Sequence, residues 1–227
     1  MLTILLWKWR QKNYRSKFTA ENVNIMCNMI GRNLDIPHRF LCITDDPQGV
    51  KCETYPLWTE PNVNLTEGRP NCLRRLKVFG EFGKELGDRL ISIDLDTVIT
   101  KNITPIVDRK EDFVIWGDTA RNTLYNGGFW IMTPGTRKQV WENFRPEMLK
   151  ETKRLGIVGS DQAIISHILG PGEATWTTED GVFSYRNHLR KGLLPKPPNA
   201  RIVFFHGSFD PWSDHCQAHK WVKENYQ

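Results

Sequence analysis

The chain has 227 residues, a formal net charge of +5 at pH 7 and a pI of about 9.0. This length allows one large domain or two small ones, with a core that folds without disulfides or structural metals. The five cysteines are scattered and form no Cys-x-x-Cys pair, so neither a disulfide framework nor a zinc site is indicated, and a cytoplasmic setting is expected. The positive charge would favour a polyanionic partner, although an ordinary basic surface explains it equally well.

Short apolar runs and helical patterns alternate along the N-terminal part of the chain. Residues 2–7 predict a buried first strand rather than a signal peptide or membrane span, because the run is short and basic residues follow it. Thr19 is a suitable cap for a helix with apolar residues at positions 23, 26, 27 and 30. Further strands are predicted over 38–44 and 50–55, and a helix over 72–86 with residues 73, 76, 79 and 86 facing inward.

The same alternation continues to the C-terminus. Strands are predicted over 90–95, 113–116, 129–132 and 202–205, helices over 136–150 and 160–169, and a long surface loop over 184–200. Strands that alternate with helices indicate an α/β fold with a largely parallel sheet, and ligands of such sheets collect at the carboxyl ends of the strands. No linker indicates a second domain.

Two acids interrupt an apolar run at Asp94-Leu95-Asp96. Carboxylates at the end of a strand that enters the core are costly unless a cation meets them. A divalent ion such as Mg²⁺ or Mn²⁺ takes oxygen ligands and often bridges substrate phosphates. The pattern therefore indicates an enzyme that handles a diphosphate, with a pair of turn-capping acids as the structural alternative.

His206 directly follows the apolar run 202–205 and precedes Gly207-Ser208. A small turn lets the backbone approach a phosphate closely. One imidazole and two carboxylates would leave positions on an octahedral metal for phosphate oxygens and water. A histidine after a strand is more often a hydrogen-bonded residue of the core or its rim, and that alternative stays open.

Two further motifs suit a hydroxylated ligand. Asn126-Gly127-Gly128 precedes an aromatic strand, where glycines leave room for a bulky ligand and the amide offers a donor and an acceptor. Asp161-Gln162 opens a helical pattern after Ser160 and would suit sugar hydroxyls. A plain turn and a helix cap are the respective alternatives.

Taken in order, these motifs resemble those of nucleotide-sugar glycosyltransferases of the GT-A fold, most closely the glycogenin-like, retaining branch. The match consists of Asp-x-Asp after a strand, Asn-x-Gly before another, Asp-Gln at a helix start, and His-Gly followed by Pro-Trp, over about residues 72–212. The resemblance implies a single Rossmann-like GT-A domain over 1–227, with a mostly parallel central sheet. Residues 1–90 would bind the nucleotide, and 91–227 the metal, sugar and acceptor.

The resemblance also implies a UDP-sugar donor, Mn²⁺ or Mg²⁺, and transfer with retention of the anomeric configuration. The implied metal ligands are Asp94, Asp96 and His206. The implied catalytic residues are Asp161, Asn126 and Asp118. The implied donor contacts are Trp7, Lys8, Tyr14, Arg75, Leu95, Asn126, Gly127, Gln162, Gly207 and Ser208.

One position departs from the family pattern. The family usually has a lysine before the final Pro-Trp that reaches the diphosphate, whereas this chain has Asp210-Pro211-Trp212. An acid cannot stabilise a diphosphate, so either another cation substitutes or the donor site is altered. Lys191 and Arg201 are the cations close by in sequence.

The acceptor is suggested by basic and aromatic residues. They interleave over 7–17, and residues 185–191 form a second basic patch, a composition that suits stacking on bases and contact with phosphates. The compact chain is also similar to small phage-type glycosyltransferases that act on hydroxymethylated DNA bases. The favoured acceptor is 5-hydroxymethylcytosine in double-stranded DNA, exposed by base flipping. A bacterial surface glycan or a protein is the alternative.

Two hypotheses from other classes remain. A non-enzymatic basic nucleic-acid-binding module would not need the Asp-x-Asp motif or His206. A sugar nucleotidyltransferase would be expected to carry a Gly-rich basic loop after the first strand, and residues 7–17 contain no glycine. We expect a cytoplasmic protein, in the host cytoplasm if it is viral, with no membrane partner; the sequence leaves the oligomeric state open.

Overall fold

The computed structural model describes residues 1–10, 17–60, 63, 72–117, 123–157, 159–193, 196–207 and 209–227. The strands are β1 (Leu2–Lys8), β2 (His38–Thr44), β3 (Glu53–Pro56), β4 (Arg89–Ile93), β5 (Thr97–Ile99), β6 (Phe113–Trp116), β7 (Asn126–Met132), β8 (Ala174–Trp176), β9 (Val182–Ser184) and β10 (Ile202–Phe204). The α-helices are α1 (Ala20–Asn33), α2 (Gly83–Leu86), α3 (Thr104–Val107), α4 (Gln139–Glu142), α5 (Met148–Arg154), α6 (Asp161–Leu169), α7 (Asp214–Gln217) and α8 (Lys220–Asn225). Residues 72–79 form a 3₁₀-helix, η2, and residues 185–193 a π-helix, η3.

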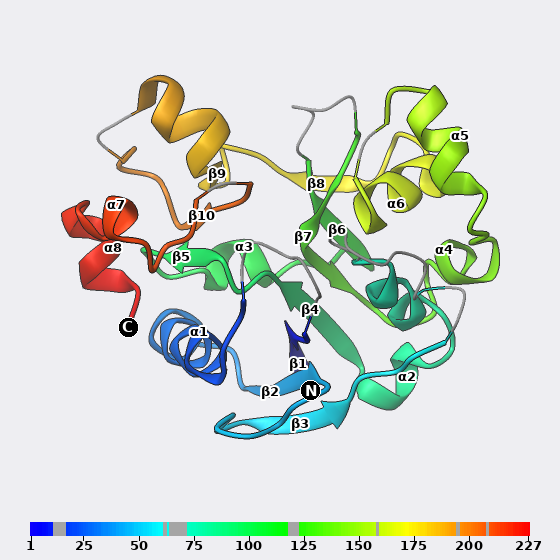
Figure 1. Ribbon diagram of the computed structural model, residues 1–227, viewed down its shortest axis with the longest axis horizontal. Helices are drawn as coiled ribbons and strands as arrows, with labels where there is room; N and C mark the ends of the chain where they lie inside the picture. Colours follow the sequence, from blue (N-terminus) through cyan, green and yellow to red (C-terminus); the bar gives the residue numbers. More distant parts are fainter. Residues whose placement is uncertain are drawn as a thin grey trace.

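The predicted α/β fold with a mostly parallel central sheet is confirmed. Seven strands form one sheet in the order β3-β2-β1-β4-β7-β6-β8 (Figure 1). β1 lies between β2 and β4 and is parallel to both. β7 is antiparallel to its neighbours β4 and β6, and β8 is parallel to β6. The reversal at β7 places the beginning of that strand beside the carboxyl end of β4.

A second, three-stranded sheet has the order β5-β10-β9. β10 is antiparallel to β5 and parallel to β9. The sequence suggested that the strand before His206 belongs to the main sheet. This is wrong, because that strand, β10, lies in the smaller sheet. Because β5 follows β4 after the three residues Asp94 to Asp96, these residues connect the two sheets.

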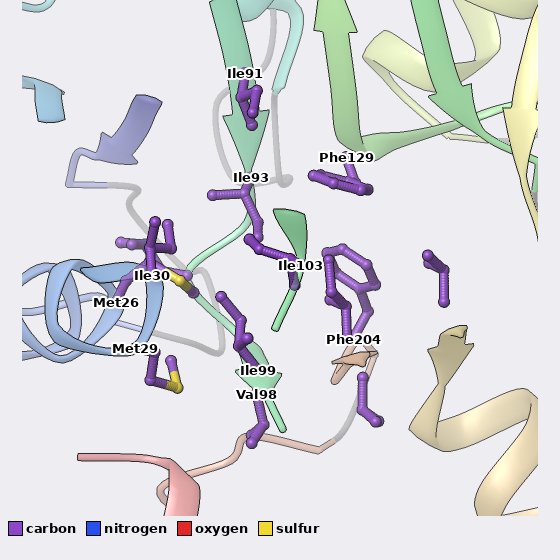
Figure 2. Close-up of a cluster of buried hydrophobic side chains, with 14 of the residues drawn as sticks. Met26, Met29, Ile30, Ile91, Ile93, Val98, Ile99, Ile103, Phe129 and Phe204 are labelled. Atoms are coloured by element: carbon purple, nitrogen blue, oxygen red, sulfur yellow. The ribbon is translucent and has the colours of Figure 1, made fainter. Parts of the chain in front are cut away.

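The side chains of the central strands alternate between two apolar clusters, as the two-residue period of a strand requires. Ile4 and Leu6 of β1 face a cluster that includes Ile91 and Ile93 of β4, whereas Leu5 and Trp7 face the other. Figure 2 shows the first cluster, in which side chains of β4 and β5 lie between Met26, Met29 and Ile30 of α1 and Phe204 of β10.

Helix α1 begins where the sequence predicts. Thr19 is its N-cap, and a capping box joins the Thr19 and Asn22 side chains to each other's backbone. Val23, Met26 and Ile30 are buried on the inner face, and Cys27 is partly buried. The capping residue and the apolar periodicity together therefore located this helix.

Three local predictions need correction. Residues 72–86 form η2 and α2 rather than one helix, with a bend at Gly80; Leu73, Leu76, Phe79 and Leu86 are buried as predicted. The helix predicted over 136–150 is divided into α4 and α5, since Pro146 disfavours helical backbone at the residue before it. The loop predicted over 184–200 contains the end of β9 and η3, in which Tyr185 and Leu189 are buried.

Among the described residues, no helix is long and apolar enough to cross a membrane.

Candidate active site

Asp94, Leu95 and Asp96 are held from both sides by backbone hydrogen bonds. The Asp94 N–H donates to the carbonyl oxygen of Gly128 in β7 at 2.9 Å. The carbonyl oxygen of Asp96 accepts from the N–H of Phe205, just after β10, at 2.7 Å. The segment thus lies at the junction of the two sheets, where the main chain fixes both carboxylates.

Among the described residues, Arg75 of η2 is the cation that contacts Asp94. Its side chain is 9% exposed, and its Nη2 lies 2.6 Å from Asp94 Oδ1. Its Nη1 lies 3.6 Å from Asp161 Oδ2 and donates to the Gly127 carbonyl oxygen at 3.3 Å. Burial disfavours the charge of Arg75, but the carboxylates of Asp94 and Asp161 outweigh this effect and raise its pKa. The guanidinium therefore stays charged and joins the acids of two elements.

Two tryptophans contribute to the surroundings of Arg75. Its guanidinium carbon lies 5.8 Å from the ring centre of Trp7 and 5.9 Å from that of Trp9, within the range of cation–π attraction. Trp7 is buried and its indole N–H donates to Ser92 Oγ at 2.8 Å. The two indole rings therefore help to orient the guanidinium of Arg75 toward Asp94 and Asp161.

Asp161, the first residue of α6, lies against bare backbone of β7. A Cβ atom on Gly127 would be 2.8 Å from Asp161 Oδ2, a contact that real Cβ atoms do not make. Burial and the charge of Asp94 raise the pKa of the Asp161 carboxyl, while Arg75 lowers it. Glycine at 127 is thus what allows a buried carboxyl to reach the edge of the sheet.

Gly128 has the same relation to Asp94. A Cβ atom there would be 2.7 Å from Asp94 Oδ2 and 3.0 Å from Asn126 Oδ1. The Gly128 N–H donates to Asn126 Oδ1 at 2.8 Å, which orients the amide at the start of β7. The two glycines therefore bring Asn126, Asp94 and Asp161 together.

Asp96 is buried beside other acids. Its pKa is raised well above the ordinary value by burial and by the charges of Asp94 and Asp210. A buried carboxylate in such surroundings favours either a proton or an added cation. The carboxylates of Asp94 and Asp96 therefore fit a divalent metal in their chemistry.

His206 faces another partner. Its Nε2 lies 2.7 Å from Ser184 Oγ, at the end of β9, and its ring centre is 6.1 Å from that of Trp116. In the described part of the chain, no three His, Cys, Asp or Glu side chains converge in a way that could hold a metal ion. The structure thus brings Asp94 and Asp96 together but does not bring His206 into one ligand set with them.

A pocket of about 60 Å³ lies over these groups. Its lining includes five residues predicted from the sequence, namely Trp7, Arg75, Asp94, Leu95 and Asp96. It also includes Trp9, Phe18 and Cys72, which were not predicted as donor contacts. Of these, Cys72 precedes Arg75 by one turn of η2, and burial raises its pKa to about 12, so the thiol stays protonated.

The other predicted donor contacts are distributed more widely. Lys8 is buried, and its ammonium donates to the Asp46 carbonyl oxygen and lies 3.8 Å from the Asp46 carboxylate, so it is already neutralised. Gln162 folds over Gly159, where an added Cβ would be 2.5 Å from Gln162 Cγ. Three predicted residues, Tyr14, Asp118 and Ser208, lie outside the described residues.

Gly207 lies beside an arginine that the sequence did not place in the donor site. A Cβ atom on Gly207 would be 2.8 Å from Arg186 Nη1, so the guanidinium lies along the turn after His206. The guanidinium of Arg201, one of the two cations named from sequence, instead donates to the Asn102 carbonyl oxygen. The side chain of Lys191 is outside the described part.

Comparison with known proteins places the fold. No family model matches the chain, and no curated protein matches it in sequence. The galactosyltransferase LgtC in complex with donor and acceptor sugar analogues aligns with a TM-score of 0.61 and 13% identity over 98% of this chain and 94% of its own. The glycosyltransferase GlyE of Streptococcus pneumoniae TIGR4 aligns with a TM-score of 0.57 and 10% identity over 94% of this chain and 57% of its own.

The bifunctional glycosyltransferase WbbM aligns with a TM-score of 0.58 and 12% identity, over 99% of this chain and 49% of its own. At these identities the likeness concerns the arrangement of the backbone. The chain has the fold of the GT-A glycosyltransferases.

Proposed function

We propose that the protein transfers a sugar from a UDP-sugar to a hydroxyl group, with Mn²⁺ or Mg²⁺ bound by Asp94 and Asp96. The observation that carries this proposal is the convergence of Arg75, Asp94 and Asp161 where β4 ends and β7 begins, on a fold that is shared with glycosyltransferases. A nucleotide-sugar site needs a cation for the diphosphate and polar groups for the sugar; a metal ion at Asp94 and Asp96 would supply the first, and Asp161 the second.

In the proposed reaction, the bond between the anomeric carbon and the diphosphate oxygen breaks and UDP leaves with the electron pair. The acceptor oxygen then bonds to that carbon, and the departing diphosphate takes the proton of the acceptor hydroxyl. A bound metal ion would supply Lewis-acid stabilisation of the departing diphosphate. Asp161 would lie at the sugar, since bare backbone at Gly127 leaves its carboxyl next to the start of β7. Asn126 would hold a sugar or acceptor hydroxyl, and retention of configuration is proposed.

His206 is proposed as the third metal ligand, a role that requires its imidazole to exchange Ser184 Oγ for the metal. His206→Ala should then raise the Mn²⁺ concentration needed for half-maximal activity. An unchanged metal titration would assign His206 to its hydrogen bond with Ser184 alone, which lies at 2.7 Å.

Arg186 is proposed as the cation that stabilises the leaving diphosphate, in place of the lysine that Asp210 replaces. It lies along Gly207, and Asp210 lies close enough to Asp96 to raise the pKa of that acid. We expect Arg186→Gln to lower kcat/KM for the UDP-sugar about 10²-fold, the usual order for loss of one transition-state contact. Arg201→Gln is the matched control, since its guanidinium binds the Asn102 carbonyl.

The favoured acceptor is 5-hydroxymethylcytosine in double-stranded DNA. Supporting features are the net charge of +5 and the exposed Arg190 of η3, whose guanidinium carbon lies 4.4 Å from the ring centre of Phe209. The basic and aromatic residues at the end of the first strand offer less surface to DNA than the sequence suggested, because Trp7 and Lys8 are buried. Changing Arg190 and Lys191 to Gln should therefore weaken use of DNA in a salt-dependent manner and leave donor hydrolysis unchanged.

The deciding experiment measures sugar transfer from a panel of UDP-sugars, with Mn²⁺, onto duplex DNA that contains 5-hydroxymethylcytosine. Nucleoside mass spectrometry should show a hexose or N-acetylhexosamine on this duplex and none on unmodified DNA. Asp96→Ala should abolish the product, whereas Asp88→Asn, which changes an exposed acid paired with the N-terminus, should not. Donor hydrolysis without transfer would reject DNA as acceptor and direct the search to glycans and proteins.

A further inference from the structure

Two imidazoles converge on one phenol where η3 meets the C-terminal helices. The Tyr185 hydroxyl lies 2.8 Å from His219 Nε2 and 3.4 Å from His215 Nε2. His215 is in α7, and His219 is the N-cap of α8. We propose that Tyr185, His215 and His219 form a site for a divalent transition-metal ion of the zinc type, separate from the proposed donor site and independent of the proposed activity.

The distances from the Tyr185 hydroxyl to the two imidazole nitrogens suit such an ion. Zinc binds imidazole nitrogen and protein oxygen at about 2.0–2.1 Å, so two ligands of a tetrahedral ion lie about 3.3 Å apart. The separation of Tyr185 Oη from His215 Nε2 already has this length, at 3.4 Å. The 2.8 Å separation from His219 Nε2 needs an opening of about half an ångström, which small side-chain rotations provide.

An ion at this site would bind neutral imidazoles and a phenolate, so its binding would release the phenol proton of Tyr185 to solvent.

The site has one rigid ligand and one accessible side. The Tyr185 ring is 1% exposed and stacks on Phe205 with ring centres 4.5 Å apart. His215 is exposed, which leaves a position for water on the ion. Because η3 and the two short C-terminal helices each supply one ligand, the ion would clamp α7 and α8, at the left of Figure 1, onto the segment that carries Arg186 and Arg190.

The test measures Zn²⁺ binding by calorimetry to the full chain carrying Asp96→Asn, so that the carboxylates of the proposed donor site do not hold the ion. We expect one Zn²⁺ per chain. His215→Asn and His219→Asn should each weaken binding by more than the 10–100-fold that loss of an outer partner costs. Tyr185→Phe keeps the stacking on Phe205, removes only the hydroxyl, and should weaken binding about 10-fold or more.

His167→Gln is the matched control and should leave binding unchanged, because this histidine belongs to α6, which lies across Figure 1 from α7 and α8. Zn²⁺ at about 100 times its Kd should raise the Tm of the parent by about 5–10 °C, with no rise in His219→Asn. Absence of binding to the parent, or equal affinity in the double histidine variant, would overturn the site. Equal affinity in Tyr185→Phe would overturn the three-ligand set, and circular dichroism identifies any variant that has not folded.

Discussion

Replacing Arg75 by methionine should destabilise the protein by about 3–5 kcal/mol at pH 8, the cost of removing one partner from a buried ion pair. Methionine approximates the arginine stem, so the packing against Trp7 and Trp9 is largely kept. The substitution removes the positive charge that lies 2.6 Å from the Asp94 carboxylate and 3.6 Å from the Asp161 carboxylate. It also removes the hydrogen bond that the guanidinium donates to the Gly127 carbonyl oxygen at 3.3 Å. For a chain of this size the loss lowers Tm by about 6–20 °C.

The effect should depend on pH with a definite sign. Without Arg75, burial keeps the folded-state pKa of Asp161 raised, and the positive charge that opposed this rise is gone. A carboxyl whose pKa is raised by folding costs stability above that pKa, and the cost disappears as pH falls toward the unfolded value. The loss in Arg75→Met should thus be larger at pH 8 than at pH 5.

Urea unfolding at the two pH values measures the effect. The control adds Asp94→Asn and Asp161→Asn, which remove the two carboxylates that Arg75 contacts, so this triple variant should regain most of the lost stability. A loss under about 1 kcal/mol, which is the range of an exposed ion pair, would refute the assignment of Arg75 as the buried counter-charge. An equally large loss in the triple variant would refute it too.

Three further predictions follow from neighbouring residues. Asp96→Asn should abolish sugar transfer and should raise Tm in EDTA at pH 8, because burial and the charges of Asp94 and Asp210 raise the pKa of Asp96. The gain in Tm should shrink toward pH 5, and a lower Tm at pH 8 would contradict this. Gly127→Ala should lower kcat about 10²-fold at near-normal Tm, since its Cβ would displace Asp161; wild-type kcat would exclude a positional role. Gly31→Ala, the matched control, has open space in α1 and should gain about 0.5–1 kcal/mol on urea unfolding without changing kcat; a loss would show hidden crowding.

Much of the fold follows from local patterns in the sequence. The apolar runs of β1, β2 and β4 and the capped, periodic α1 each contain the information for their own conformation, and the alternation of elements led to the α/β class. The sequence was less informative about conformation where residues that favour different structures stand close together. Pro146 divides a helical pattern, and the basic composition after Ser184 concealed the π-helix with its buried Tyr185 and Leu189.

The sequence by itself determined that Asp94 and Asp96 end a buried strand and that Gly127 and Gly128 lie directly before an aromatic one, because such features depend on neighbours along the chain. The structure extends that strand, β7, back to Asn126. Only the tertiary structure decided which groups meet. The antiparallel pairing of β7 with β4 sets the glycines against Asp94 and Asp161, and η2 adds Arg75 between them. It also turns His206 to Ser184, pairs Lys8 with Asp46 and places Arg186 along Gly207. These contacts join residues far apart in sequence, and strand pairing and packing, rather than local propensity, select them.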